Sequence, residues 1–287
     1  MEPVVTVGLD GSPAALSAAH WAAEEAERRG CPLRLLHAWP MLAPEPTQVP
    51  AEKEHNQPAS RLVRTVRTEL RADHPDLRVV GELVADDARS ALLRATAEST
   101  VTVLGSQGLY PDESFFLGGV SAPVMARAEG PLVLVRAAAS HGQGAPPAAA
   151  APVVVALKLR GPCDSVLAFA FDAAAARGAP LRVVHGLSLP PPAPPRGTDH
   201  DPAEADARSA RRRLDDVLYP WRKRYPHVEV AVCLGTEGRS TTVVRAAEGA
   251  CLLVVGHRRH HLPRGPGAVV QAAVHHARCP VAVVPHG

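Results

Sequence analysis

The chain has 287 residues, which exceeds the usual size of one domain and predicts two domains of roughly 140 residues each. Hydrophobic residues make up 46% of the chain but aromatic residues only 3%, so we expect cores of Val, Leu and Ala, as in buried parallel strands flanked by Ala-rich helices. The formal net charge of +2 is too small to indicate nucleic-acid binding, and neither an apolar run of about 18 residues nor a signal peptide is present, so we expect a cytoplasmic protein with no nucleic-acid or membrane partner.

The first half of the chain alternates between short apolar runs, which predict strands, and longer Ala-rich or amphipathic segments, which predict helices. The predicted strands are Val4–Leu9, Leu33–Trp39, Arg78–Leu83, Val101–Leu104 and Leu132–Arg136. The predicted helices are Pro13–Arg29, Ser60–Asp73, Arg89–Ser99 and Val120–Ala128, and Pro40–Pro58 is predicted as a Pro-rich loop. Ser12 is the expected N-cap of the first helix and Gly30 its C-terminal stop. Five strands with four crossing helices predict a doubly wound parallel sheet, whose ligand crevice lies at the carboxyl ends of the strands.

An internal repeat indicates that the second half of the chain is a copy of the first. The sequence RGCPLRLLH at residues 29–37 reappears as RGAPLRVVH at residues 177–185, an offset of 177 − 29 = 148. Other matches keep nearly the same offset over a whole domain, which chance matches would not do. The segment between the copies is rich in Ala, Pro and Gly, as linkers are. The sequence therefore predicts two tandem α/β domains over residues 1–136 and 152–287, joined by a linker over residues 137–151.

The run from Val101 to Ser121 predicts a loop that binds phosphate. It places Gly105 and Gly108 at the exit of a β-branched strand, and Gly118 and Gly119 before a helix. Glycines at a strand exit remove the Cβ that would keep the backbone away from phosphate oxygens, and the free N–H groups at the start of a helix favour an anion. A triphosphate is the ligand that this run predicts. Glycines at strand ends are also common turn residues, so a purely structural role is the alternative.

Three motifs occur together in the first half: VGLDGS at residues 7–12, the strand end HAW at residues 37–39, and the spacing G-x2-G-x9-G at residues 105–118. With these motifs and its two copies, the chain resembles the tandem form of the universal stress protein family over nearly its whole length. In the ATP-binding branch of that family, Ser or Thr follows the last glycine, whereas this chain has Gly119. Loss of one hydrogen bond to a phosphate oxygen costs about 1 to 3 kcal/mol, although the backbone N–H of Gly119 remains. We therefore expect weakened ATP binding.

The resemblance implies a set of ATP-binding residues. Asp10 would accept hydrogen bonds from the ribose hydroxyls or the adenine edge, and the backbone of Ala38 would meet adenine. The implied site residues are Gly8, Leu9, Asp10, Ala38, Leu104, Gly105, Gln107, Gly108, Gly118, Gly119, Val120 and Ser121. The implied ligand is ATP, with or without Mg²⁺. Asp-Gly-Ser before a helix is also a common turn and cap, which is the structural alternative for Asp10.

The second copy has lost these residues. Lys158 stands at the position of Asp10, since 158 − 10 = 148. The interval Gly256–Gly267 spans 11 residues, against 13 for Gly105–Gly118, and its loop is basic and His-rich over His257–Arg264. Adjacent histidines lack the spacing that turns two rings toward one metal, so a solvated surface loop is favoured over a different anion site or a metal site.

No catalytic or metal-binding motif is found: the sequence has no GK[ST] loop, no G-x-S-x-G elbow and no CxxC pair. We expect a stress-response regulatory protein that binds ATP in its first domain, with a second domain that is structural or recognises an unknown regulatory protein partner. One alternative is a slow ATPase or another ATP-using enzyme, for which Asp112 and Glu113 are the only acidic pair in the loop. The other alternative is a scaffold that binds no nucleotide. The last strands of the copies, Leu132–Arg136 and Val281–Val284, are expected to pair as an intramolecular pseudo-dimer or between chains in a homodimer.

Overall fold

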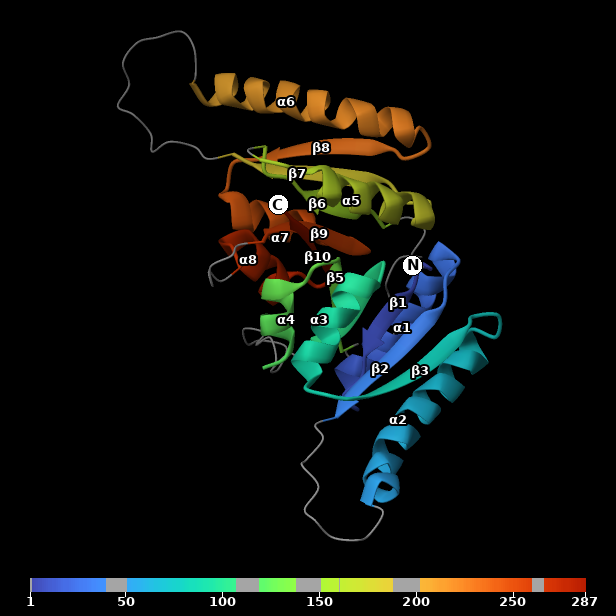
Figure 1. The fold of residues 1–287 in the computed structure, drawn as a ribbon. Coiled ribbons are helices and arrows are strands. Elements are labelled where there is room, and N and C mark those ends of the chain that lie inside the picture. The colour runs from blue at the N-terminus through green and yellow to red at the C-terminus, as the bar shows by residue number, and fades with distance from the viewer. Residues whose placement is uncertain are drawn as a thin grey trace. The chain divides into compact units, whose positions relative to one another are not determined.

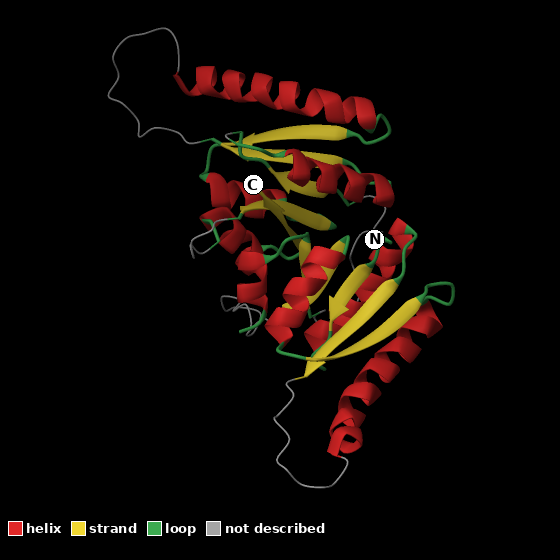
Figure 2. Cartoon of the chain, viewed as in Figure 1, coloured by secondary structure: helices red, strands yellow, loops and turns green. Residues whose placement is uncertain are grey.

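The computed structural model describes residues 2–39, 51–106, 119–137, 151–159, 161–187, 202–259 and 266–287. Contacts within the chain divide it into two compact units, Met1–Gly142 and Gln143–Gly287. Strands and helices alternate along each unit (Figure 1, Figure 2). Among the described residues, no helix combines the length and the apolar character needed to cross a membrane.

The described part of the first unit contains one parallel sheet with helices between its strands. Its elements are β1 (Val5–Gly8), α1 (Pro13–Arg29), β2 (Leu33–Trp39), α2 (Ala51–Asp73), β3 (Val79–Ala85), α3 (Ala88–Glu98), β4 (Val101–Ser106), α4 (Ser121–Arg127) and β5 (Leu132–Arg136). Within this unit the strand order is β3-β2-β1-β4-β5, and every neighbouring pair is parallel. This order confirms the doubly wound fold that the sequence predicted.

Helices cover both faces of this sheet. A Cβ added at Gly105 would lie 2.5 Å from the backbone of Ala14 in α1, whereas a Cβ added at Gly8 would lie 3.0 Å from Leu92 of α3. Since α2 contacts α1 and α4 contacts α3, the first two helices lie on one face and the next two on the other. Such an arrangement leaves the carboxyl ends of the central strands as the edge where a ligand can enter.

The first helix begins and ends as predicted, but the second begins earlier. The Ser12 hydroxyl accepts a hydrogen bond from the N–H of Ala15 at 3.1 Å, and Gly30 ends α1 with a φ of 61°. The predicted Pro-rich loop is wrong over its last part, because α2 begins at Ala51 and contains Pro58. The residues before this proline, AEKEHNQ, include several strong helix formers, whose propensity offsets the one missing N–H donor.

The second unit repeats the same order of elements. They are β6 (Val153–Ala156), α5 (Asp164–Arg177), β7 (Leu181–Gly186), α6 (Pro202–Arg224), β8 (Val230–Gly235), α7 (Arg239–Ala246), β9 (Leu252–Arg258), α8 (Ala268–His276) and β10 (Val281–His286). Within this unit the strand order is β10-β9-β6-β7-β8, again with parallel pairs throughout. The two units are therefore tandem copies of one fold.

The second unit adds an aromatic cluster to the aliphatic core that the composition predicted. Phe171 of α5 is fully buried, and its ring stacks on Trp221 at a centroid distance of 5.8 Å and on Tyr225 at 5.3 Å. The Tyr225 hydroxyl also hydrogen-bonds the carboxylate of Asp172. Large rings bury much apolar surface in a fixed geometry, so this cluster holds the end of α6 against α5.

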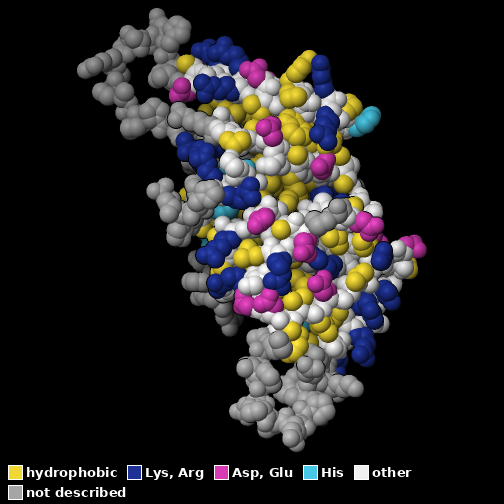
Figure 3. Space-filling view, in the orientation of Figure 1, with side chains coloured by type: hydrophobic (Ala, Val, Ile, Leu, Met, Phe, Trp, Pro, Cys, Tyr) yellow, Lys and Arg dark blue, Asp and Glu magenta, His cyan; other side chains and the backbone are white. Residues whose placement is uncertain are grey.

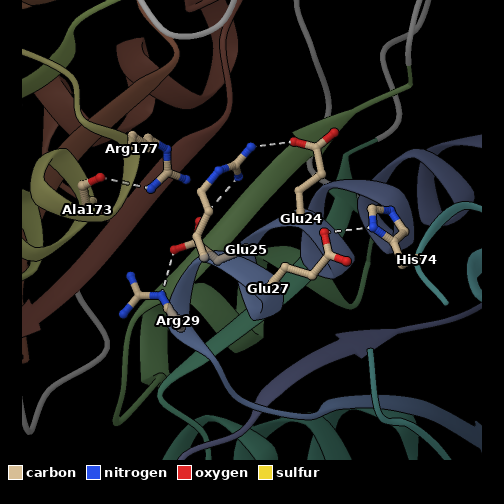
Figure 4. Close-up of polar contacts among 8 residues, drawn as sticks. Glu24, Glu25, Glu27, Arg29, His74, Ala173 and Arg177 are labelled. Atoms are coloured by element: carbon tan, nitrogen blue, oxygen red, sulfur yellow. Dashed lines mark hydrogen bonds and ion pairs between the residues drawn. The ribbon is translucent and has the colours of Figure 1, made fainter. Parts of the chain in front are cut away.

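Charged side chains of α1 in the first unit are paired within the helix and with the residue after α2 (Figure 4). The Glu25 side chain is 0% exposed, and the Arg29 Nε donates to its Oε1 at 2.6 Å. A buried carboxylate is stable only when it is paired in this way. Glu27 lies 2.8 Å from the Nδ1 of His74, which follows α2. The contact of Glu27 with His74 thus ties α1, whose first turn borders the candidate site, to the end of α2.

Candidate functional site

The strand order of the first unit reverses between β1 and β4. From β1 the chain proceeds outward through β2 and β3, whereas β4 and β5 extend in the other direction. In doubly wound sheets, ligands bind at the carboxyl ends of the strands at such a point. Asp10 follows β1, and Gly105 lies near the end of β4, which pairs with β1. The fold thus brings the two main sequence-predicted features to one edge.

Two hydrogen bonds hold the backbone of the residue that follows β1. The Leu9 N–H donates to the Leu36 carbonyl at 2.8 Å, and the His37 Nδ1 donates to the Leu9 carbonyl, also at 2.8 Å. His37 belongs to the HAW motif, but the sequence predicted no contact for its side chain. The signal was present in the repeat, because this histidine ends both copies of the RGxPLRxxH motif.

Asp10 takes part in the turn that leads into α1. Its Oδ1 accepts a hydrogen bond from the N–H of Ser12 at 2.8 Å, and Gly11 between them has a φ of 83°, which suits glycine. The structural alternative for Asp10 is therefore realised. Asp10 is nevertheless exposed at the carboxyl edge, and no hydrogen bond to its Oδ2 is recorded among the described residues. One carboxylate oxygen thus remains for a ligand.

Gly105 is explained by packing. The sequence interpretation assigned its missing Cβ to the approach of a phosphate, but an added Cβ would lie 2.5 to 2.7 Å from backbone atoms of Ala14 and Ala15. Real Cβ atoms essentially never come so close to a backbone atom. The glycine therefore lets β4 lie directly against the first turn of α1, which places the start of that helix at the candidate site.

The far side of the predicted loop is open. Gly119 and Val120 are exposed, and Ser121 is the first residue of α4, whose N-cap residue Val120 makes no side-chain capping hydrogen bond. An added Cβ at Gly119 would meet no atom of the described residues within 4 Å, and the φ of Gly119 lies outside the left-handed region. A side chain at this position is therefore tolerated. Gln107, Gly108 and Gly118 lie outside the described residues, as do Asp112 and Glu113.

Three further predicted site residues differ in which of their atoms a ligand can reach. Leu9 and Leu104 are 6% and 5% exposed, so their side chains belong to the core and only their backbones can reach a ligand. Ala38 lies near the end of β2 and is partly exposed. Within the described part of the chain, no group of three or more His, Cys, Asp or Glu side chains is placed to hold a metal ion.

The comparison with protein families decides the assignment. The sequence pattern described as the universal stress protein family matches residues 3–136 and again residues 151–285. The chain belongs to this family. A universal stress protein of Mycobacterium tuberculosis is 28% identical over 292 residues, which cover 97% of this chain and 95% of the relative. Another from the same organism is 30% identical over 266 residues, which cover 90% of each chain.

A solved universal stress protein shares the fold of the whole chain. The crystal structure of a universal stress protein from Archaeoglobus fulgidus matches 99% of this chain and 98% of its own, with a TM-score of 0.76 and 16% sequence identity. At this identity the similarity shows the fold alone. It agrees with the parallel strand order described above for each unit.

The second universal stress protein unit keeps the scaffold and changes the edge. The His185 Nδ1 donates to the Leu157 carbonyl at 2.8 Å, as His37 does to Leu9 in the first unit. Leu157 is followed by the exposed Lys158, which stands at the position of Asp10. The prediction of a solvated loop is wrong for His257, which is only 5% exposed, because β9 extends to Arg258 and pairs with β10.

Proposed function

We propose that this universal stress protein binds ATP at the carboxyl edge of its first sheet and acts as a stress-response regulator without being an enzyme. The proposal rests on the positions of Asp10 and of the Gly119–Ser121 segment. Asp10 follows β1 and the segment follows β4, and the strand order reverses between these two strands. The membership of the family and the glycine spacing at residues 105–118 support the choice of ligand.

The proposed contacts are assigned to groups at this edge of the first sheet. The Asp10 Oδ2 accepts a hydrogen bond from a ribose hydroxyl, while Oδ1 keeps the turn in place. The backbone of Ala38 meets the adenine ring. The phosphates lie against the glycine loop and the exposed backbone of Gly119 and Val120, where N–H groups and the missing Cβ allow close approach.

The proposed affinity is lower than a hydroxyl at position 119 would give. One hydrogen bond to a charged phosphate oxygen contributes about 1 to 3 kcal/mol, which corresponds to roughly 5- to 150-fold in affinity. The site therefore responds to ATP concentration over a higher range than a site with the hydroxyl. Such a site suits a protein whose nucleotide occupancy reports the state of the cell to a regulatory protein partner.

Calorimetric titration of the full chain with ATP tests the proposal. Gly108→Val should abolish binding, because a branched side chain would occupy the space of a phosphate. Gly256→Ala, at the position in the second unit that corresponds to Gly105, should leave ATP affinity unaltered. Equal losses from both changes would show that binding is not specific to the first unit.

A second measurement separates the regulatory proposal from its alternatives. Mass spectrometry of small molecules released from the denatured protein should detect ATP, and a phosphate-release assay should show no turnover above that of Gly108→Val. Sustained release that this variant lacks would establish an ATPase instead. An absence of both binding and copurified nucleotide would favour the scaffold.

A further inference from the structure

We propose that the second unit binds a compact, multiply charged oxyanion of the phosphate class through Lys158, Arg258 and His286. This inference goes beyond the proposed function and does not depend on ATP binding in the first unit. The site occupies the carboxyl edge of the second sheet, where the first sheet has its candidate nucleotide site.

Three neighbouring strands bring the three side chains to this edge. Lys158 follows β6, Arg258 ends β9 and His286 ends β10. The register pairs His286 directly with Arg258, and β6 pairs with β9 along its whole length. Because the carboxyl ends of parallel strands meet at one edge, these residues gather there although they lie far apart in the sequence.

The surroundings of two glycine residues show where two of the side chains lie. The Arg258 Nη2 would lie 3.3 Å from a Cβ at Gly161, so the guanidinium lies against the loop that leads into α5. The ring of His286 would lie 3.1 Å from a Cβ at Gly256, so the imidazole lies across the end of β9. Cys163, the N-cap residue of α5, makes no side-chain capping hydrogen bond. The free N–H groups at the start of α5 add a further attraction for an anion.

The positive charges of this cluster are not balanced within the described part of the chain. No ion pair to Lys158, Arg258 or Arg259 is recorded among the described residues. The acidic residue at the start of α5, Asp164, is exposed. A concentration of uncompensated cations is the arrangement that oxyanion sites use.

The positive charges of this cluster also affect the pKa of His286. Burial lowers the pKa of its imidazole below the usual value. A hydrogen bond with the backbone of Gly287 opposes this shift, and the charges of Arg258, His257 and Lys158 lower the pKa further. The His286 Nδ1 is buried and has no hydrogen-bond partner among the described residues. A bound anion would offset these charges and favour the protonated ring.

The chemistry of the cluster selects among ligand classes. Lys158 replaces the carboxylate that would accept from ribose hydroxyls, so a nucleoside is not the favoured ligand. Cations repel a metal ion. On the face shown in Figure 3, Lys and Arg side chains are interspersed with Asp and Glu, so no continuous basic stripe for nucleic acid runs over it. A small oxyanion such as pyrophosphate or phosphate fits a cluster confined to one edge.

Calorimetric titration of the full chain with sodium pyrophosphate, and separately with sodium phosphate, tests the inference. Lys158→Gln and Arg258→Gln should each weaken binding roughly tenfold or more, because each removes a charge-assisted hydrogen bond. Arg213→Gln, at an exposed position of α6, is the matched control for total charge and should change affinity less than twofold. Thermal unfolding of each variant checks that the fold is kept.

Three outcomes would overturn the inference. They are no binding at millimolar anion, equal losses from Arg213→Gln and Arg258→Gln, and a loss caused by Asp10→Asn with none from Lys158→Gln. The last outcome would assign the anion to the first unit. NMR titration gives an independent readout: saturating pyrophosphate should raise the pKa of His286, and an unchanged pKa would contradict contact with the ring.

Discussion

The close approach of β4 to α1 predicts that Gly105→Ala destabilises the first unit in the absence of any ligand. An added Cβ would lie 2.5 Å from a backbone carbon of Ala14, whereas ordinary contact begins near 3.4 Å, so the helix and strand must separate by 3.4 − 2.5 = 0.9 Å. Overpacking of this kind costs about 1 to 3 kcal/mol. For a unit of this size, that corresponds to a fall of roughly 4 to 12 °C in Tm.

Chemical denaturation of the full chain, followed by circular dichroism, measures this effect. Gly119→Ala is the matched control, because its added Cβ meets no atom within 4 Å in the part of the chain that the structure describes. It should change the free energy of unfolding by less than about 0.5 kcal/mol. Gly256→Ala should have a smaller effect than Gly105→Ala, because its Cβ meets side chains of Val166 and His286 that can rotate away. An unchanged unfolding midpoint for Gly105→Ala would refute the packing explanation. Loss of ATP affinity with full stability would return this glycine to the phosphate site.

Three further predictions concern the two edges. Gly119→Ser restores a hydroxyl in open space, so calorimetry should show ATP binding tighter by roughly 5- to 150-fold, and a loss of affinity would mean that the glycine itself contacts the phosphate. His37→Phe removes the donor to the Leu9 carbonyl and should lower the free energy of unfolding by about 1 to 3 kcal/mol in urea denaturation, and equal stability would show that water replaces the bond. His286 has a lowered pKa in the folded state, so the unfolded chain binds more protons just below the ordinary pKa of about 6.5, and stability should be full above that pH and fall on acidification through it. His286→Gln should flatten this pH dependence, and an identical pH profile in the variant would assign the proton uptake to another group.

The fold was predictable because its signals are local. Apolar runs, the Ser12 cap and the Gly30 stop located α1 and the strands, and the repeat offset located the second copy. The start of α2 was not predicted, because Pro58 is typical of a loop. The helix propensity of the residues around this proline determined the structure instead.

The site was less predictable because its contacts join distant segments. The need for glycine at position 105 comes from Ala14, some ninety residues earlier, and no local pattern reports this approach. His257 belongs to a sequence that is typical of a solvated loop, yet pairing of its strand with β10 buries it. Asp10 was assigned both a turn and a ligand role by the sequence, and the structure establishes the turn.

In each unit a histidine hydrogen-bonds the carbonyl of the residue that precedes Asp10 or Lys158, so the backbone at this edge is held in the same way in both units. His37 and His185 hold Leu9 and Leu157 at the same 2.8 Å distance, although the next residue is acidic in one unit and basic in the other. The scaffold of the edge is thus separable from its ligand chemistry. Residues can therefore be exchanged between the copies at matching positions, and the sequence of one unit guides the redesign of the corresponding edge in the other.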